Sequence, residues 1–300
     1  MFKDPITTFT SDNSLLKLIA TIPSLQNYKL YSQDTNNSNF PTFAKVLETT
    51  KSTLSPDWTL TSKFGGSSCE TKINFMNTYS PLKPTFVFQH GLLITNHKAN
   101  LDAIISKSFY KEFNIVSIKA AWHTNPITVV SEALASFNNT VLMLASSVHA
   151  IEQVYSFHKQ VSKEAAVVSG TSMGGITCSN HYFYYNTADY YFPIVAHPNF
   201  ARLIISPKYA SFFADFSSMA DNKSYLECMD IPHKIVDQSN KSKIFPILAT
   251  LDEAVPYTDA KAFWSSFLTN EYACGHFEIV KYAKSIRQYI LDNIHEIHRT

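Results

Sequence analysis

Residues 165–175 of the chain read Ala-Ala-Val-Val-Ser-Gly-Thr-Ser-Met-Gly-Gly. Four apolar residues lead into a glycine-rich turn, which is typical of a short buried strand that ends sharply. A helix is predicted to follow, over residues 176–185. Ser172 has a glycine two positions before it and another two positions after it, which fits the G-x-S-x-G turn between a strand and a helix. The same residues are consistent with an ordinary tight turn in which Ser172 only caps the helix.

Steric constraints explain why glycine occupies two positions of this turn. We expect a side chain at Gly170 or Gly174 to collide with neighbouring backbone, because the turn is sharp and holds Ser172 in a strained conformation. The helix that follows directs its free N–H groups and the positive end of its dipole toward the serine. The surroundings of Ser172 therefore favour negative charge.

Composition and charge limit the class of protein. The 300 residues are 45% hydrophobic and carry a net charge of +1, so they can form a large core and give no reason to expect a nucleic-acid partner. The polar residues 1–14 lack the apolar core of a signal peptide, and apolar runs such as 141–145 are far shorter than a membrane span. The four cysteines are scattered, which predicts free thiols and a cytoplasmic protein.

The pattern of the chain changes near residue 58. Residues 1–57 show no recognisable chemistry and are expected to form an extension packed on the core, with short helices at 14–25 and 43–50. Alternating residues then predict an antiparallel strand pair, at 58–64 and 70–79. After it, strands are predicted at 85–89, 114–121, 190–196, 244–250 and 271–273, and helices at 101–113, 126–159 with a break near 138–139, 258–269 and 277–297. This alternation predicts an α/β fold with a mostly parallel sheet and helices on both faces.

Active sites in such sheets lie at the carboxyl ends of the strands. The residues that follow the predicted strands are, in order, His90-Gly91-Leu92, Trp122-His123, Ser172, His197-Pro198, Asp252 and Gly275-His276. They include a serine, a carboxylate and a histidine in the order Ser, Asp, His, which is one of the known chain orders of a catalytic triad.

These motifs resemble those of the α/β-hydrolases, from about residue 58 to the end of the chain. Gly170–Gly175 resembles the nucleophile elbow, His90-Gly91-Leu92 the oxyanion loop, Asp252–Pro256 the D-x-x-V-P acid loop, and Gly275-His276 the histidine loop. The spacings also fit, with 80 positions from Ser172 to Asp252 (252 − 172) and 24 from there to His276 (276 − 252). Within the superfamily the chain looks most like small esterases related to the prolyl oligopeptidase and dienelactone hydrolase groups.

The resemblance implies a serine hydrolase that cleaves small-molecule carboxylic esters through an acyl-enzyme, with no metal or organic cofactor. Ser172 would be the nucleophile and His276 the general base that later protonates the leaving group. Asp252 would orient the imidazole and stabilise its positive charge. The backbone N–H groups of Leu92 and Met173 would form the oxyanion hole.

Two of these assignments have rivals in the sequence. Glu253 and Asp259 lie close to Asp252, which we prefer because it holds the first position of the D-x-x-V-P pattern. His276 is one of 11 histidines and could be a core residue. Its position directly after the last predicted strand favours the catalytic role.

The substrate is expected to meet residues at other strand ends and in an insertion. His90, Trp122 and His123 are candidate substrate-binding residues, although His90 is also expected to bond within its own loop. Residues 198–243 are too long for a plain connection and predict a short lid. Its aromatic candidates are Phe200, Phe212, Phe213 and Phe216. They indicate an apolar acyl or aryl substrate, unless they serve only to pack the lid onto the body.

Two other functions share the same features. An amide, peptide or thioester hydrolase would use every residue named above. A hydrolase-fold protein that only binds a ligand would be indicated by a missing triad residue, and none is missing from this sequence.

Overall fold

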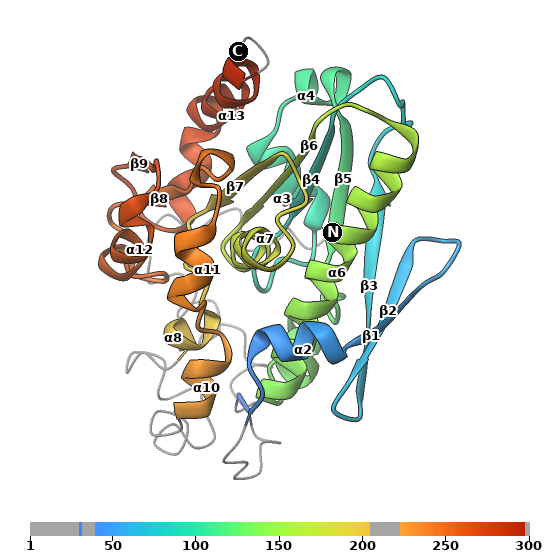
Figure 1. Ribbon diagram of the computed structural model, residues 1–300, viewed down its shortest axis with the longest axis vertical. Coiled ribbons are helices and arrows are strands. Elements are labelled where there is room, and N and C mark those ends of the chain that lie inside the picture. The colour runs from blue at the N-terminus through green and yellow to red at the C-terminus, as the bar shows by residue number, and fades with distance from the viewer. Residues whose placement is uncertain (1–29, 32–39, 205–222, 298–300) are drawn as a thin grey trace.

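The computed structural model describes residues 30–31, 40–204 and 223–297. They form a nine-stranded sheet in the order β1-β2-β3-β5-β4-β6-β7-β8-β9 (Figure 1). The strands are β1 (Lys51–Leu54), β2 (Thr59–Phe64), β3 (Ser67–Phe75), β4 (Thr85–Gln89), β5 (Asn114–Lys119), β6 (Ala166–Thr171), β7 (Tyr190–Ile194), β8 (Ile247–Ala249) and β9 (Asn270–Tyr272). Strands β1, β2, β3 and β5 pair antiparallel in turn, whereas the pairs from β5 to β9 are parallel.

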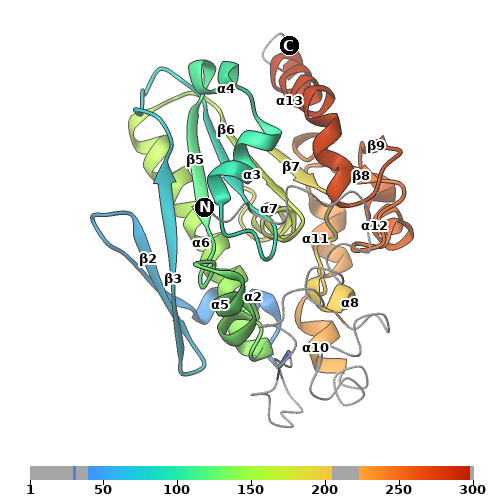
Figure 2. The same ribbon diagram turned by 180° about the vertical axis from the view of Figure 1, so that it is seen from behind.

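Helices cover both faces of the sheet. Figures 1 and 2 show α2 (Phe43–Thr49), α6 (Phe137–Val161) and α7 (Met173–Tyr184) on one face, and α3 (His97–Ile104), α4 (Lys107–Glu112) and α13 (Ala283–Ile297) on the other. The central strands β4, β6 and β7 are therefore buried along their whole length. In β4, Val87 packs on the α6 face while Phe86 and Phe88 pack on the α3 face. The predicted mostly parallel sheet with helices on both faces is confirmed.

Two predicted helices differ from those observed. The helix expected at 101–113 is two helices, α3 and α4, separated by extended residues at Ile105 and Ser106. The break expected at 138–139 lies earlier, after α5 (Pro126–Thr128) and a π-helical turn, η3 (Val129–Ala133). Because the Ser136 side chain accepts the backbone N–H of Asn139, the two asparagines lie inside the first turn of α6.

The length and hydropathy of the helices bear on membrane insertion. No single described helix has both the length and the apolar character of a membrane span. The segment Pro126–Ala133 meets both criteria only together with α6, as a pair bent by 112°.

The sheet begins inside the region expected to be an extension. Strand β1 pairs with β2 from Lys51 to Leu54, and the predicted helix at 43–50 is α2, with Thr42 as its N-cap. The helix expected at 14–25 lies outside the described residues. The described part of the extension thus contributes an edge strand and a covering helix to the main domain.

The insertion after β7 contains α8 (Phe200–Ile204), α10 (Lys223–Cys228), α11 (His233–Gln238) and a 3-10 turn, η5 (Lys241–Lys243). Helices α8 and α10 lie at the lower end of Figure 1, where the carboxyl ends of the parallel strands point. Tyr225 of α10 packs on Phe137 and Phe40, with ring centroids 4.6 and 6.1 Å away. The insertion therefore contacts both the start of α6 and the N-terminal segment.

Candidate active site

Ser172 occupies the turn between β6 and α7. Its backbone has φ 54° and ψ −116°, a conformation that residues other than glycine adopt only under strain. The turn is held because the Ser172 N–H donates to the Ile194 carbonyl of β7, at 2.9 Å. The Ser172 hydroxyl makes no hydrogen bond with the part of the chain that the structure describes. It is therefore available to a substrate or a base.

The two glycines of the turn are required by close backbone contacts. A Cβ atom at Gly170 would lie 2.4 Å from the carbonyl carbon of Gly174, and one at Gly174 would lie 2.0 Å from the carbonyl oxygen of Gln89. Such distances are too short for any side chain. Glycine thus lets the first turn of α7 approach the end of β4.

Asp252 and His276 form a buried pair in the loops that follow β8 and β9. Asp252 Oδ2 lies 2.7 Å from His276 Nδ1, and both side chains are almost completely inaccessible. A carboxylate only accepts, so the Nδ1–H donates to it and Nε2 keeps the lone pair that a general base needs. The other Asp252 oxygen accepts the Val255 N–H at 2.7 Å, which fixes the carboxylate. The rivals Glu253 and Asp259 are exposed.

Neighbouring backbone bonds hold the acid and histidine loops side by side. The Leu251 N–H donates to the Cys274 carbonyl at 3.0 Å, beyond the last paired residues of β8 and β9. The Gly275 N–H donates to the Glu278 side chain at 3.2 Å, so Glu278 closes the histidine loop. Glu278 was not singled out from the sequence, although an acidic residue three positions after Gly275 is a capping signal.

Ser172, Asp252 and His276 all follow parallel strands and therefore lie at one end of the sheet. No hydrogen bond links Ser172 to His276 in the described structure. Such contacts are often long in an enzyme without substrate and shorten when the substrate binds.

The loop after β4 lies against the serine turn. A Cβ atom at Gly91 would lie 3.4 Å from Ser172 Cβ. The loop turns at once, because the Ile94 N–H donates to the Gly91 carbonyl at 3.3 Å and Leu93 has φ 63°. This is the pattern of a type II turn, with Leu92 at its second position. The Leu92 N–H donates to no atom among the described residues, and the Met173 N–H is the first of α7.

Solved structures share the fold of this chain. Est1E from Butyrivibrio proteoclasticus superposes with a TM-score of 0.52 at 11% identity, covering 79% of this chain and 98% of its own. Acetyl xylan esterase 1 from Thermoanaerobacterium superposes with a TM-score of 0.53 at 10% identity, covering 91% and 98%. The chain has the α/β-hydrolase fold. The sequence itself matches no family model and no curated protein.

Both of the histidines predicted to bind substrate, His90 and His123, are buried in this α/β-hydrolase fold. His90 and His123 have no exposed surface, and their rings lie 4.7 Å apart. Burial holds the pKa of His90 well below its usual range and lowers that of His123 to about 4, so both are neutral near neutral pH. Trp122 is half-buried, with a strained backbone at φ 61°. Neither histidine offers a surface to a substrate in this conformation.

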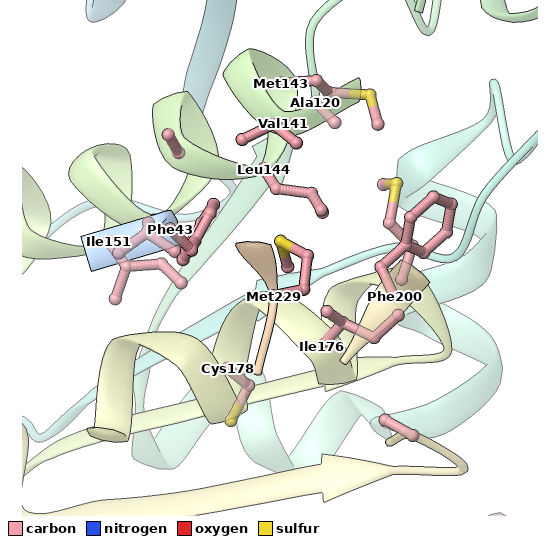
Figure 3. Packing of buried hydrophobic residues seen from close by; sticks show 14 of the residues in the cluster. Phe43, Ala120, Val141, Met143, Leu144, Ile151, Ile176, Cys178, Phe200 and Met229 are labelled. Atoms are coloured by element: carbon pink, nitrogen blue, oxygen red, sulfur yellow. The ribbon is translucent and has the colours of Figure 1, made fainter. Parts of the chain in front are cut away.

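The lid aromatic residues fall into two groups. Phe200 is 4% exposed and packs in the core; Figure 3 shows it with Met229 beside Ile176 of α7. Phe212, Phe213 and Phe216 lie outside the described residues. For Phe200 the structure therefore favours the packing role over the wall of a pocket.

Other reactive groups do not gather near the site. Within residues 30–31, 40–204 and 223–297, no cluster of His, Cys, Asp or Glu could hold a metal ion. All four cysteines are buried, and none of them forms a disulfide with another described residue. Burial raises the pKa of the Cys69, Cys178 and Cys228 thiols, so these three are poor nucleophiles.

Proposed function

We propose that this protein is a serine hydrolase that cleaves carboxylic esters through Ser172, His276 and Asp252. The observation that carries the proposal is the buried contact between Asp252 Oδ2 and His276 Nδ1 at 2.7 Å, at the same end of the sheet as the strained Ser172 turn. Burying a carboxylate beside an imidazole carries a desolvation penalty, so the pair is weak evidence for a contribution to stability and is better explained by a role in the site. Beside a strained serine it suits nucleophilic acyl transfer.

In the proposed reaction, His276 Nε2 removes the hydroxyl proton of Ser172 as the oxygen attacks the ester carbonyl. The Leu92 and Met173 N–H groups donate to the resulting oxyanion. His276 then gives its proton to the leaving alcohol, and an ester bond to Ser172 remains. Water, deprotonated by the same imidazole, attacks this acyl-enzyme. The bond to Ser172 then breaks, the imidazolium returns the proton to the serine oxygen, and the acid is released. Asp252 stabilises the imidazolium in both halves.

The substrate is proposed to be a small ester with an apolar acyl or aryl group. The amino-acid sequence of the insertion, with Phe212, Phe213 and Phe216, supports this choice, whereas Phe200 packs in the core and does not bear on it. The solved structures of this fold include Est1E with ferulic acid bound and an acetyl xylan esterase. Feruloyl and acetyl esters are therefore included in the test.

The test measures hydrolysis of p-nitrophenyl acetate and butyrate, methyl ferulate and acetylated xylan, with the corresponding amides and thioesters in parallel. Ser172→Ala should abolish the activity. Ser179→Ala is the matched control, because it removes a serine hydroxyl that lies inside α7 and donates to the Gly175 carbonyl, away from the serine turn. Equal rates for wild type and Ser172→Ala would refute the proposal. Faster amide or thioester cleavage would keep the triad and change the substrate class.

A further inference from the structure

His90 holds the peptide group that carries one of the proposed oxyanion donors. The Ala120 N–H donates to His90 Nε2 at 3.1 Å, so the proton of the neutral ring is on Nδ1. That Nδ1–H donates to the Gly91 carbonyl at 2.8 Å. The Gly91 carbonyl and the Leu92 N–H belong to the same planar trans peptide and point in opposite directions. Fixing the carbonyl therefore fixes the direction of the Leu92 N–H.

The His123 ring packs against the His90 ring. The two rings lie 4.7 Å apart at an interplanar angle of 56°, and both are fully buried. The Nδ1 of His123 donates to the Ala121 carbonyl at 2.9 Å, which stops the ring from rotating. The turn that carries it is constrained by the positive φ of Trp122. The end of β5 thus supplies both a backbone donor to His90 and a ring packed against it.

The unused nitrogen of His123 has no structural explanation of its own. His123 Nε2 is buried and has no hydrogen-bond partner in the described structure. A buried acceptor without a donor is unfavourable, so an apolar residue would suit the core better if packing were the only requirement. The features of the ring that do have partners are its bond to the Ala121 carbonyl and its contact with the His90 ring.

We infer that His123 is a positioning residue for the oxyanion hole, acting through His90 to aim the Leu92 N–H at the carbonyl oxygen above Ser172. This inference rests on the proposed function. Neither histidine touches the reacting atoms, and the effect reaches them through the Gly91–Leu92 peptide.

The test compares an aryl ester with its thionoester, in which sulfur replaces the carbonyl oxygen. Hydrogen-bond donors stabilise a sulfur anion less than an oxyanion, so a well-aimed oxyanion hole gives a preference for the oxygen ester. His123→Phe should lower kcat and this preference, each about tenfold, and change KM by less than about threefold. His123→Asn keeps a donor but cannot replace the ring beside His90, so it should give the same losses if the Phe variant does not fold.

The matched control is His158→Phe. His158 is also a buried imidazole, but it bonds to Thr85 at the opposite end of β4 and to the Glu164 carbonyl. It should leave the oxygen preference unchanged. An unchanged preference in a folded His123 variant, or an equal fall in the control, would overturn the inference. A wild-type protein without activity dependent on Ser172 would instead refute the proposed function on which it rests.

Discussion

Replacing Leu92 by proline should remove one oxyanion donor without disturbing the fold. Leu92 is the second residue of the turn closed by the Ile94 N–H and the Gly91 carbonyl, and Leu93 at the third position has φ 63°. Proline is favoured at the second position of a type II turn, and the preceding glycine tolerates it. The Leu92 N–H donates to no described atom, so its removal breaks no hydrogen bond in that part of the chain.

The expected loss follows from the number of donors. Loss of one oxyanion-hole donor raises the barrier by about 3 kcal/mol, which is about a hundredfold to a thousandfold in kcat. KM should change little, because the ground-state carbonyl binds weakly to the same donor. Leu92→Ala is the control, since it trims the side chain and keeps the N–H.

The assay is steady-state hydrolysis of p-nitrophenyl butyrate by both variants, with thermal unfolding to confirm that each is folded. A kcat for the proline variant close to that of the alanine variant would assign the second oxyanion donor to another group.

Three further predictions follow from the same geometry. Asp252→Asn should lower kcat by about a thousandfold or more with an unchanged melting temperature, because the imidazole loses its orienting carboxylate. The control Glu253→Gln changes an exposed neighbour and should leave kcat unchanged. A fully active Asp252→Asn variant would assign the acid of the triad to another residue. Gly174→Ala should lower the free energy of unfolding, measured in urea, by about 3 kcal/mol or more, because the new Cβ would lie 2.0 Å from the Gln89 carbonyl oxygen. A free energy of unfolding equal to that of wild type would contradict this backbone contact. The free energy of unfolding should fall as the pH drops from about 6.5 to about 4. In this range His123 is protonated in the unfolded chain but stays neutral in the folded state, where burial lowers its pKa to about 4. The His123 contribution is about 3 kcal/mol, and His123→Phe should flatten the fall by that amount.

The sequence predicts those features that depend on residues close together in the chain. Strand β4 was predicted at its observed bounds because its apolar run ends at the His90-Gly91 turn. The glycines of the serine turn were correctly expected to have no room for a side chain. The D-x-x-V-P pattern favours Asp252 over Glu253 and Asp259, and the structure buries Asp252 against His276 while these two rivals are exposed.

Long-range packing decided what the sequence could not. The helix at 101–113 is divided at Ile105 and Ser106 although the apolar periodicity continues through them, and the extended Ile105 packs in the same buried cluster as residues of α3 and α4. His90 and His123 follow strands and were candidate substrate-binding residues, and only the structure shows that their rings pack on each other. The bond that His90 is expected to make within its own loop is confirmed by its contact with the Gly91 carbonyl. Strand β1 was missed because its residues become a strand by pairing with β2, and its four residues have no periodicity strong enough to predict it.

The central claim is that Ser172 is an activated nucleophile. Its most direct measurement is labelling of the folded protein with a fluorophosphonate, followed by peptide mass spectrometry to locate the adduct. The proposal predicts one adduct per chain, on Ser172, that is lost in Ser172→Ala, in urea-unfolded protein and largely in His276→Ala. A folded wild-type protein that remains unlabelled at Ser172, or carries the adduct on another residue, would contradict it.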